Sequence, residues 1–472
     1  MHNSMSHTLR RLAQATVLCV ALLLSALLPA GTAHAAPVTV PVGARIDDTV
    51  GSPVHAHGGG VIQVGSYYYW FGEDRKADDT FRYISVWRSI DLKSWEFRNH
   101  VLTQASHSEL QLANLERPKV VYNQTTGQFV LWAHKENGVD YTEAKVAVAV
   151  SSTVDGTYTY QGSFRPLGFE SRDMTLFRDD DGSAYLISAA NDNADLNVYR
   201  LTPDYTGVQS LTRTLFPGDR REAPAMFKRN GVYFLLTSGQ NGWLPTQQQY
   251  ATASCVACAW TANANVGDSQ TYGSQTAYVL TIQGASATSH LYMGDRWAGS
   301  WGGPVEDSTY VWLPLAFPTA TSMTMSYARQ LTIDTAAGTI TPIGTGYDKL
   351  TLAHSGKCVK AGQSAVVQYD CTGNTDQQWR IDSISNGKSR LVSRSANKCI
   401  DLAASVITWT CGVDKFKQHW TIQDLGTGYV QLVNAVTGEC AEVANSSTAN
   451  NAQLKPAVCT GAPNQQFQRT SL

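Results

Sequence analysis

The last third of the chain repeats itself three times, and this repeat constrains the fold more than any other feature. Three cysteines recur at intervals of 41 residues, and a second cysteine follows each of them. Each unit also ends on a similar phrase: DQQW, KQHW or NQQF. Three units of about 40 residues, each with its own short cross-link, predict one threefold β structure. The expected pairs are Cys358 with Cys371, Cys399 with Cys411, and Cys440 with Cys459.

The N-terminus is typical of an exported protein. The segment LRRLAQATVLCVALLLSALLPAGTAHAAP joins a basic start to a short apolar run and an Ala-x-Ala site. Residues 1–35 are therefore predicted to be a secretory signal peptide cleaved after Ala35, since the run is too short for a membrane anchor. Cys19 leaves with this segment, and the eight remaining cysteines suit an oxidising, extracellular compartment. Cys255 and Cys258 are expected to form a small loop disulfide rather than a zinc site, because no second ligand pair stands nearby.

Five similar hairpin signals occur between about residues 55 and 295, with almost no helical periodicity. A β-sandwich would also give strands and turns, but five similar units at larger spacing favour blades around an axis. We therefore expect an all-β chain, with a five-bladed β-propeller over residues 37–342 followed by a β-trefoil over residues 346–472. The hairpin signals are VIQVGSYYYWFG, VVYNQTTGQFVLWAH, LFRDDDGSAYLIS, FKRNGVYFLL and LTIQGASATSHLYM.

Polar residues recur 8 to 11 positions before the turn glycine of each hairpin. Innermost propeller strands line one channel, so these side chains are expected to converge. One acid at such a place is equally well explained as a strand end at a solvated face, but three at matched offsets predict a catalytic cluster. Paired carboxylates around one pocket are typical of glycoside hydrolysis, in which one group protonates the leaving oxygen and another activates water. The residues are Glu116, Asp173, Glu222, Gln275 and His57.

The composition excludes some classes of partner. Only 16% of residues are charged and the formal net charge is −2, so a nucleic-acid partner is not expected. No later segment is apolar enough to cross a membrane, and we expect a monomer. Aromatic residues make up 10% of the chain, which suits stacking on sugars but equally suits a β-rich core.

The repeated C-terminal segment resembles a ricin-B-type β-trefoil, a carbohydrate-binding module of family 13, through its three Q-x-W-like motifs. In that family each lobe binds sugar through an acid shortly after the first cysteine and an aromatic residue before the second. The resemblance implies a sugar site in the middle lobe at Asp401 and Trp409, next to Gln418. Trp379 and Trp420 are expected to be core residues.

The other two lobes depart from this pattern. The first lobe keeps Tyr369 as its aromatic residue but has Lys360 in place of the acid. The third lobe keeps an acid, Glu442, but has Ala457 in place of the aromatic residue. The middle lobe is therefore the strongest candidate.

The first part of the chain resembles glycoside hydrolase family 43. SIDLKSWEF, SRDMTLFRDDDG and REAPAMFKRNGVYFLLTSG match that family's pattern over most of residues 40–340. The resemblance implies Glu222 as general acid and Asp173 as the residue that orients it and modulates its pKa. The family's usual general base, an Asp before the first hairpin, is missing from VHAHGGGVIQ.

This departure points to one branch of the family. AHGGGVIQVGSYYYWFGED, LERPKVVYN, TSGQNGWLP and GSQTAYVL resemble the exo-β-1,3-galactanases, which lack the usual base and often carry an appended carbohydrate-binding module. The resemblance implies a secreted inverting enzyme that releases galactose from the β-1,3-galactan backbone of arabinogalactan. It places Glu116 and Gln275 around the reacting sugar; we expect Gln275 to position the water and Glu116 to supply negative charge or accept the water's proton.

The same resemblance suggests further contacts to the substrate, each of which is about as well explained by a core or surface role. We expect no cofactor, although the channel leaves open a structural calcium ion. The segment RDDDG is interpreted as a tight turn rather than a calcium loop. The expected substrate-binding residues are Glu73, Tyr141, Asn241, Trp243 and His57.

Two alternatives stay open. The same propeller hosts α-L-arabinofuranosidases and β-xylosidases, and the missing base argues against them. A chain without its base is also compatible with a non-catalytic galactan-binding lectin that works through the trefoil, but the retained carboxylates argue against that.

Overall fold

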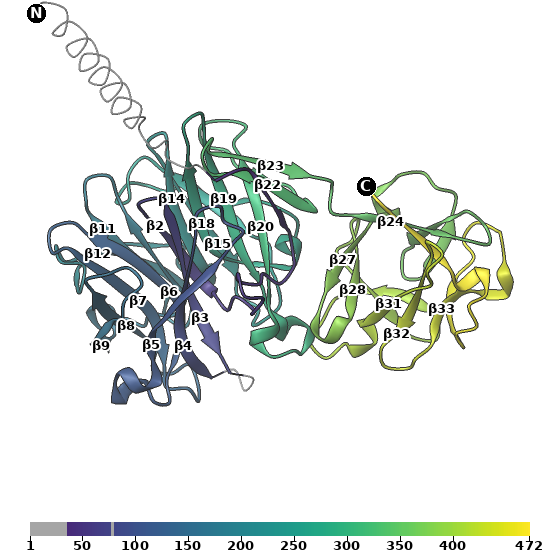
Figure 1. Cartoon of the computed structure of the whole chain (residues 1–472), viewed down its shortest axis with the longest axis horizontal. Coiled ribbons are helices and arrows are strands. Elements are labelled where there is room, and N and C mark those ends of the chain that lie inside the picture. Colours follow the sequence, from purple (N-terminus) through teal and green to yellow (C-terminus); the bar gives the residue numbers. More distant parts are fainter. Residues whose placement is uncertain (1–34, 77–79) are drawn as a thin grey trace, which may run out of the picture. The chain divides into compact units, whose positions relative to one another are not determined.

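The computed structural model describes residues 35–76 and 80–472, and this part of the chain is all-β (Figure 1). The predicted signal peptide lies, except for Ala35, outside the described residues. In the described ranges no helix is long and apolar enough to cross a membrane. Single helical turns of the 3-10 type occur between strands: η1 (Gln104–Ser106), η2 (Ser108–Leu110), η3 (Pro166–Gly168), η4 (Thr271–Gly273), η5 (Ala298–Trp301), η6 (Val305–Asp307), η7 (Thr375–Gln377), η8 (Ser385–Gly387), η9 (Phe416–Gln418), η10 (Ala444–Ser446) and η11 (Pro463–Gln465).

Five antiparallel sheets of four strands follow one another along the described residues, and within each sheet the strands pair in chain order. Each strand pairs with the strand that follows it in the chain, whether a tight turn or a longer loop joins the two. The sheets consist of β2 (His57–Val64), β3 (Tyr67–Arg75), β4 (Phe81–Ser89) and β5 (Glu96–Thr103); β6 (Asn114–Asn123), β7 (Gln128–Glu136), β8 (Lys145–Ser151) and β9 (Thr159–Phe164); β10 (Met174–Arg178), β11 (Ala184–Ala190), β12 (Asp195–Leu201) and β13 (Val208–Leu215); β14 (Arg221–Arg229), β15 (Val232–Gly239), β16 (Gln249–Ala253) and β17 (Ala264–Asn265); β18 (Gln275–Gln283), β19 (Thr288–Arg296), β20 (Thr309–Ala316) and β21 (Thr324–Met325).

All five predicted hairpins are confirmed, and each one opens a sheet. The turn between β14 and β15 shows why: Asn230 and Gly231 both have positive φ, at 50° and 79°, which suits a tight hairpin turn. The RDDDG segment is a tight turn as well, because the Gly182 N–H donates to the Asp179 carbonyl.

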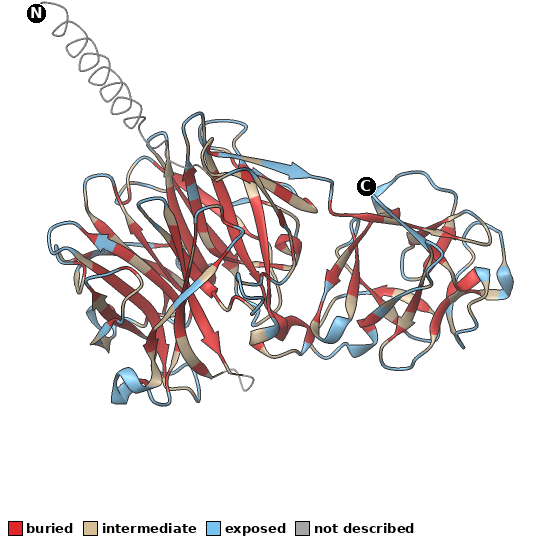
Figure 2. Ribbon diagram, in the orientation of Figure 1, coloured by how far each residue is buried: buried red, intermediate tan, exposed pale blue. Residues whose placement is uncertain are grey.

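The first strands of the five sheets contact one another in a closed series, from β2 through β6, β10, β14 and β18 back to β2. Apolar side chains fill the space between neighbouring sheets, as with Trp132 of β7 and Leu186 of β11. Such side chains each contribute roughly 2–3 kcal/mol when fully buried. Figure 2 shows the result, with buried strands and exposed loop tips. The innermost strands are therefore rigid supports for side chains near the axis.

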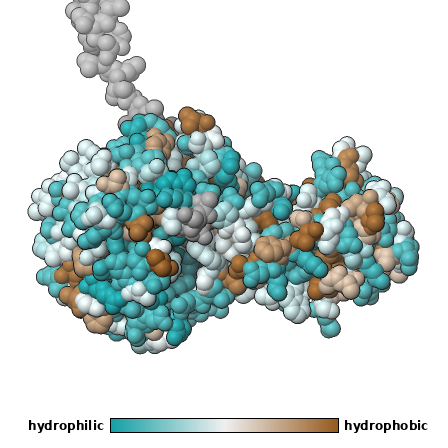
Figure 3. All heavy atoms as spheres, turned by 90° about the horizontal axis from the view of Figure 1, so that it is seen from below, coloured by the Kyte–Doolittle hydropathy of each residue, from teal (hydrophilic) through white to brown (hydrophobic). Residues whose placement is uncertain are grey.

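A three-stranded sheet pairs the first strand of the described residues with two strands that follow the five sheets, and the remaining strands form one larger sheet. The face in Figure 3 is mostly hydrophilic with scattered apolar residues, which is ordinary for a protein surface. The three-stranded sheet consists of β1 (Val38–Pro41), β22 (Gln330–Asp334) and β23 (Thr339–Ile343). The larger sheet consists of β24 (Asp348–Leu352), β25 (Cys358–Ala361), β26 (Val366–Tyr369), β27 (Trp379–Ser383), β28 (Ser389–Ser393), β29 (Cys399–Leu402), β30 (Val406–Trp409), β31 (Trp420–Asp424), β32 (Val430–Asn434), β33 (Cys440–Val443), β34 (Leu454–Ala457) and β35 (Phe467–Ser471).

The threefold repeat has a physical basis in this last part. Trp379, Trp420 and Phe467 end the three repeated phrases, are fully buried and share one core cluster. The two indole N–H groups donate to backbone carbonyls, so neither of these two buried donors is left unpaired. The disulfides are confirmed as Cys358–Cys371, Cys399–Cys411, Cys440–Cys459 and Cys255–Cys258.

Candidate active site

A cavity of about 330 Å³ collects most of the residues that the sequence singled out. They come from the first strands β6, β14 and β18, from the second strand β3 and from the loops beside the strands. The cavity is large enough for a sugar unit and is lined mainly by groups that can hydrogen-bond. The lining consists of Glu73, Arg75, Glu116, Arg117, His134, Tyr141, Arg172, Asp173, Asn193, Glu222, Gln240, Gly242, Trp243, Gln275 and Trp297.

Strand irregularities aim the key side chains. The β14–β15 pairing loses its register between Glu222 and Ala225, and Ala223 inside this bulge has a φ of 51°. The β6–β7 pairing breaks in the same way after Glu116, where Arg117 has a φ of 52°. Bulges re-aim side chains, and a non-glycine residue at positive φ costs on the order of 1–3 kcal/mol. Strain stored at these two places is consistent with a functional site.

Glu222 has the environment of a proton donor. Its side chain is buried, and Oε1 accepts a hydrogen bond of 2.9 Å from Gln275 Nε2, while Asn193 Nδ2 lies 3.5 Å from Oε2. Burial and then the negative charge of Asp173 raise the pKa of Glu222 to about 8, against the opposing charge of Arg117. The carboxyl group is therefore mostly protonated near neutral pH.

Asp173 is held beside Glu222 by two donors. Arg117 Nε lies 2.8 Å from Asp173 Oδ1, and the Ala223 N–H donates to Oδ2 at 3.1 Å. The second bond fixes the backbone directly after Glu222. Asp173 thus acts on the acid in two ways, through its charge and through the position of the strand.

Gln275 has a fully occupied amide. Its oxygen accepts from Arg117 Nη2 at 2.5 Å and from Trp297 Nε1 at 2.9 Å. Because both partners are obligate donors, the amide cannot be flipped, and its nitrogen must face Glu222 and Ser238. Both lone pairs of the oxygen are engaged, so this oxygen can hold a water only after a bound sugar takes over one of these donors.

Glu116 is an ionised carboxylate surrounded by donors. Oε1 accepts from Arg75 Nη2 at 2.6 Å and from the Tyr141 hydroxyl at 2.7 Å, and His134 Nδ1 lies 3.3 Å from Oε2. Burial opposes the charge of Glu116, but Arg75 and His134 outweigh it and hold the pKa below its usual range. Glu116 is therefore a source of negative charge and a weak proton acceptor.

The carboxylates do not fit a metal site. Glu116, His134 and Asp173 offer ligand atoms within 4.8 Å of one another. However, Arg75 and Arg117 already neutralise the two acids. A histidine between two carboxylates is protonated and has no lone pair to give. Guanidinium groups take the place that a calcium ion would need.

Three of the predicted substrate contacts line the cavity. Glu73 is buried and pairs with Arg75 at 2.6 Å, while burial raises its pKa, helped by Glu116 and opposed by Arg75. Tyr141 presents its hydroxyl to Glu116, and Trp243 is half-buried against Trp297 with ring centroids 5.6 Å apart. Trp243 therefore offers a ring face supported from behind.

Two predicted contacts lie outside this cavity. His57 is 2% exposed, stacks on Tyr310, and places Nδ1 3.1 Å from Asp295 Oδ1. Asn241 is exposed and is not among the lining residues. The offset that selected His57 fixes a strand position but not the direction of the side chain, and the prediction of Asn241 rests on the family resemblance alone. Both residues stay predictions as substrate contacts.

The sequence reasoning missed the cations of the site. Arg75 lies two residues after Glu73 and so on the same face of β3, and Arg117 directly follows Glu116. His134 lies opposite Glu116 in the β6–β7 ladder. The spacing of Arg75 and Glu73 within one strand could have indicated that Arg75 belongs to the site. His134 could not have been found in this way, because its position depends on the pairing register of β6 and β7.

In the C-terminal part, the middle lobe matches its prediction best. Gln418 is buried and donates to Asp401 Oδ2 at 3.0 Å, and Trp409 is 54% exposed. The third lobe repeats the acid contact, since Gln465 donates to Glu442 Oε2 at 2.8 Å. An oriented acid beside an exposed ring is suited to a sugar.

The first lobe differs in its ring. The Lys360 ammonium lies 4.5 Å from the centre of the Tyr369 ring and 3.4 Å from Asp376. This ammonium covers the face on which a sugar would stack, so Tyr369 is less accessible as a platform.

A buried glutamic acid with a raised pKa beside a second carboxylate in a sugar-sized cavity is the arrangement that glycoside hydrolases use. Sequence profiles described as "Glycosyl hydrolases family 43" and "Ricin-type beta-trefoil lectin domain" match residues 54–280 and 347–467. The chain belongs to glycosyl hydrolase family 43 and carries a ricin-B-type lectin domain at its C-terminus, as the sequence resemblance predicted.

Solved structures and one curated protein are similar to this chain. An exo-β-1,3-galactanase from Clostridium thermocellum is 40% identical, with 92% of this chain and 100% of that chain covered and a TM-score of 0.64. An exo-β-1,3-galactanase from Phanerochaete chrysosporium, solved with galactose, is 27% identical, with 92% and 93% covered and a TM-score of 0.65. A xylan 1,3-β-xylosidase from Vibrio sp is 24% identical over 215 residues, and the match spans 41% of this chain and 37% of that protein's length.

Proposed function

We propose that the protein is a secreted exo-β-1,3-galactanase that releases galactose units from the β-1,3-galactan backbone of arabinogalactan. The observation that carries this proposal is the buried Glu222 beside the half-buried Asp173, in a cavity that Gln275 and Glu116 complete. The substrate is inferred from the two exo-β-1,3-galactanases to which almost the whole chain is similar.

The reaction is proposed to invert the anomeric centre. Glu222 gives its proton to the glycosidic oxygen as the bond to the anomeric carbon breaks, and a water on the opposite face forms the new bond and passes its extra proton to the surrounding water. Glu116 supplies negative charge near the developing positive charge on the sugar. Gln275 keeps Glu222 in place and holds the water once the sugar has displaced one of its donors.

No group in this scheme is a strong base. Glu116 is stabilised as an anion by Arg75 and Tyr141, and an amide such as Gln275 accepts protons poorly. Proton donation by Glu222 is therefore the step on which the rate depends most. The scheme predicts a steep loss of activity at alkaline pH and only a weak dependence at mildly acidic pH.

The same proposal includes the domain architecture, the export of the protein and its oligomeric state. We take the five four-stranded sheets as the blades of a five-bladed propeller over residues 37–342, and residues 346–472 as a β-trefoil that binds polysaccharide through Asp401 and Trp409. Four disulfides support export to an oxidising compartment. We expect a monomer.

Analysis of products tests the proposal. The purified protein, incubated with β-1,3-linked galacto-oligosaccharides, should release galactose one unit at a time. Release of pentose from arabinogalactan instead would favour an arabinofuranosidase or xylosidase, and the absence of any newly formed reducing ends would favour a lectin.

A further inference from the structure

Glu136 is a buried carboxylate at the end of β7 that does not line the cavity, and every bond that it makes serves a neighbouring part of the site. Its Oε2 accepts from the backbone N–H groups of Glu143 and Ala144, both at 3.0 Å. Its Oε1 lies 2.8 Å from His134 Nε2. A buried charge is tolerated only when it is paired and hydrogen-bonded, and Glu136 has three donors.

His134 connects Glu136 to the cavity. The ring is 1% exposed, and its other nitrogen, Nδ1, lies 3.3 Å from Glu116 Oε2. The Nδ1 contact is an ion pair without hydrogen-bond geometry, but a neutral imidazole would turn a lone pair towards one of these two carboxylates, so the flanking acids favour the doubly protonated ring. Burial disfavours this charge, but Glu116 and Glu136 outweigh it and raise the pKa of His134 to about 9.

Other titratable groups lie close to His134 and Glu116. The Tyr141 ring is 5.9 Å from the His134 ring, and Asp173 offers an oxygen within 4.8 Å of the Glu116 and His134 ligand atoms. Arg75 approaches from β3 and binds Glu116 on its other oxygen. His134 therefore faces carboxylate oxygens, whereas Arg75 binds the other oxygen of Glu116.

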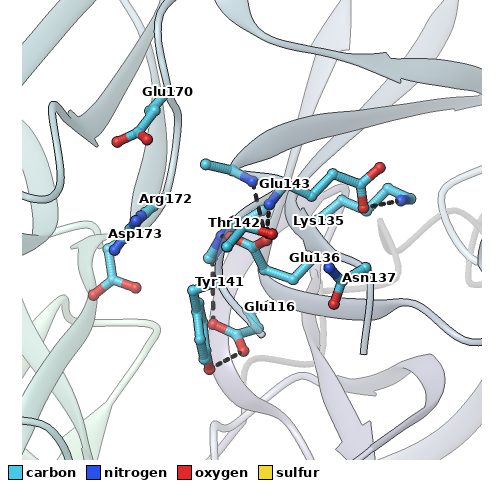
Figure 4. Close-up of polar contacts among 12 residues, drawn as sticks. Glu116, Lys135, Glu136, Asn137, Tyr141, Thr142, Glu143, Glu170, Arg172 and Asp173 are labelled. Carbon is cyan, nitrogen blue, oxygen red and sulfur yellow. Dashed lines mark hydrogen bonds and ion pairs between the residues drawn. The ribbon is translucent and has the colours of Figure 1, made fainter. Parts of the chain in front are cut away.

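The loop of residues 137–143 gives Glu136 a second route to the cavity. Glu136 closes this loop by holding its last N–H groups, and Arg165 supports it by donating to the carbonyls of Thr142 and Glu143. The loop carries Tyr141, whose hydroxyl donates to Glu116 Oε1 at 2.7 Å (Figure 4). Figure 4 shows Tyr141 and Glu116 turned towards each other below the loop.

We propose that Glu136 and His134 are positioning residues that hold Glu116 and Tyr141 together as one sugar-binding unit. His134 fixes the Glu116 carboxylate from one side, and Glu136 fixes both His134 and the loop that carries Tyr141. The proposal rests on the proposed function, because it assigns the unit to the sugar that Glu222 cleaves.

The variant Glu136→Gln separates charge from shape. The amide oxygen can still accept from the backbone of Glu143 and Ala144, but its NH₂ group then faces His134 Nε2 and favours the neutral ring. We expect kcat/KM on β-1,3-galactobiose to fall about 10- to 100-fold, mainly through KM. The alkaline limb of the pH profile should also move below pH 8, because His134 now loses its proton before Glu222 does.

Glu143→Gln is the matched control. It removes one carboxylate charge from the loop that Glu136 holds, but the Glu143 carboxylate pairs with Lys135 and Lys145 and not with His134. This variant should keep the parent kcat/KM and pH profile. Equal effects of the two variants, or an unchanged pH profile in Glu136→Gln, would overturn the proposal.

An NMR titration of the His134 ring gives a test that needs neither substrate nor activity. In the parent protein the ring should stay protonated through pH 8, and in Glu136→Gln it should titrate at least one pH unit lower. A ring that is already neutral at pH 7 in the parent protein would overturn the proposal whether or not the protein cleaves galactan. A parent protein that shows the expected His134 titration but releases no galactose would instead contradict the proposed function.

Discussion

Asp173→Asn should move the pH at which activity is lost, because Asp173 keeps Glu222 protonated. A pKa of about 8 leaves Glu222 about nine-tenths protonated at pH 7, whereas at its ordinary value of 4.5 about one molecule in 300 would carry the proton. Burial is the larger cause and is retained in the variant. Removing a neighbouring like charge shifts a pKa by about 1–3 units, so the alkaline limb should fall from about pH 8 to roughly pH 5–7.

The cost follows from that shift. With a limb near pH 6, the protonated fraction at pH 7 falls about tenfold, which is about 1.4 kcal/mol of activation free energy. The assay is kcat/KM for β-1,3-galactobiose from pH 4 to 10, together with an aryl galactoside whose leaving group needs no proton. Because Glu222 must carry its proton to act as the acid, activity is present below the pKa of Glu222 and is lost as the pH rises through this pKa.

Two results would refute this reasoning. One is an Asp173→Asn variant whose alkaline limb stays near pH 8. The other is a Glu222→Gln variant with near-full activity on galactobiose, since loss of a general acid should cost about 10²–10⁴-fold there and much less on the aryl substrate.

Further predictions concern the amide, the aromatic platform, the lectin domain and its cross-links. Gln275→Ala removes a hydrogen bond to Glu222 and the shared acceptor of Arg117 and Trp297, so kcat should fall about 10²–10³-fold, and an unchanged kcat would exclude a role in the reaction. In Gly299→Ala the added methyl group would lie 2.4 Å from the Trp243 ring and must displace it, so KM for galactobiose should rise and overpacking should cost about 1–3 kcal/mol of stability. Asp401→Ala with Trp409→Ala should abolish retention on galactan without changing turnover of soluble galactobiose, and unchanged retention would place the binding site elsewhere. Cys399→Ser with Cys411→Ser opens a 12-residue loop and should lower the unfolding free energy of the lectin domain by about 3 kcal/mol, measured by calorimetry.

The fold was largely accessible from the sequence because its signals are local. Turn residues such as Asn230 and Gly231 specify a hairpin by themselves, and the repeated cysteines specify the disulfides. The closed series of contacts between the first strands could be established only from the structure, because contacts such as that between β18 and β2 join distant parts of the chain.

The candidate site was accessible only in part. Matched offsets brought Glu222, Asp173 and Glu116 to one cavity, but the same rule selected His57, which turns away towards Asp295. Local bulges determine the directions in which these side chains point, and the periodicity of the sequence does not predict where a bulge occurs. The long-range pairing of Arg117 with Asp173 could not be deduced, since it depends on two sheets meeting at the axis.

The most direct test of the whole account is the first product formed from β-1,3-galactotriose, followed by proton NMR as the reaction starts. The account predicts galactose and galactobiose in equal amounts, with the galactose appearing first as the α-anomer, because water attacks opposite to the group that Glu222 protonates. Galactose that appears first as the β-anomer, or the absence of cleavage by a folded protein, would contradict it.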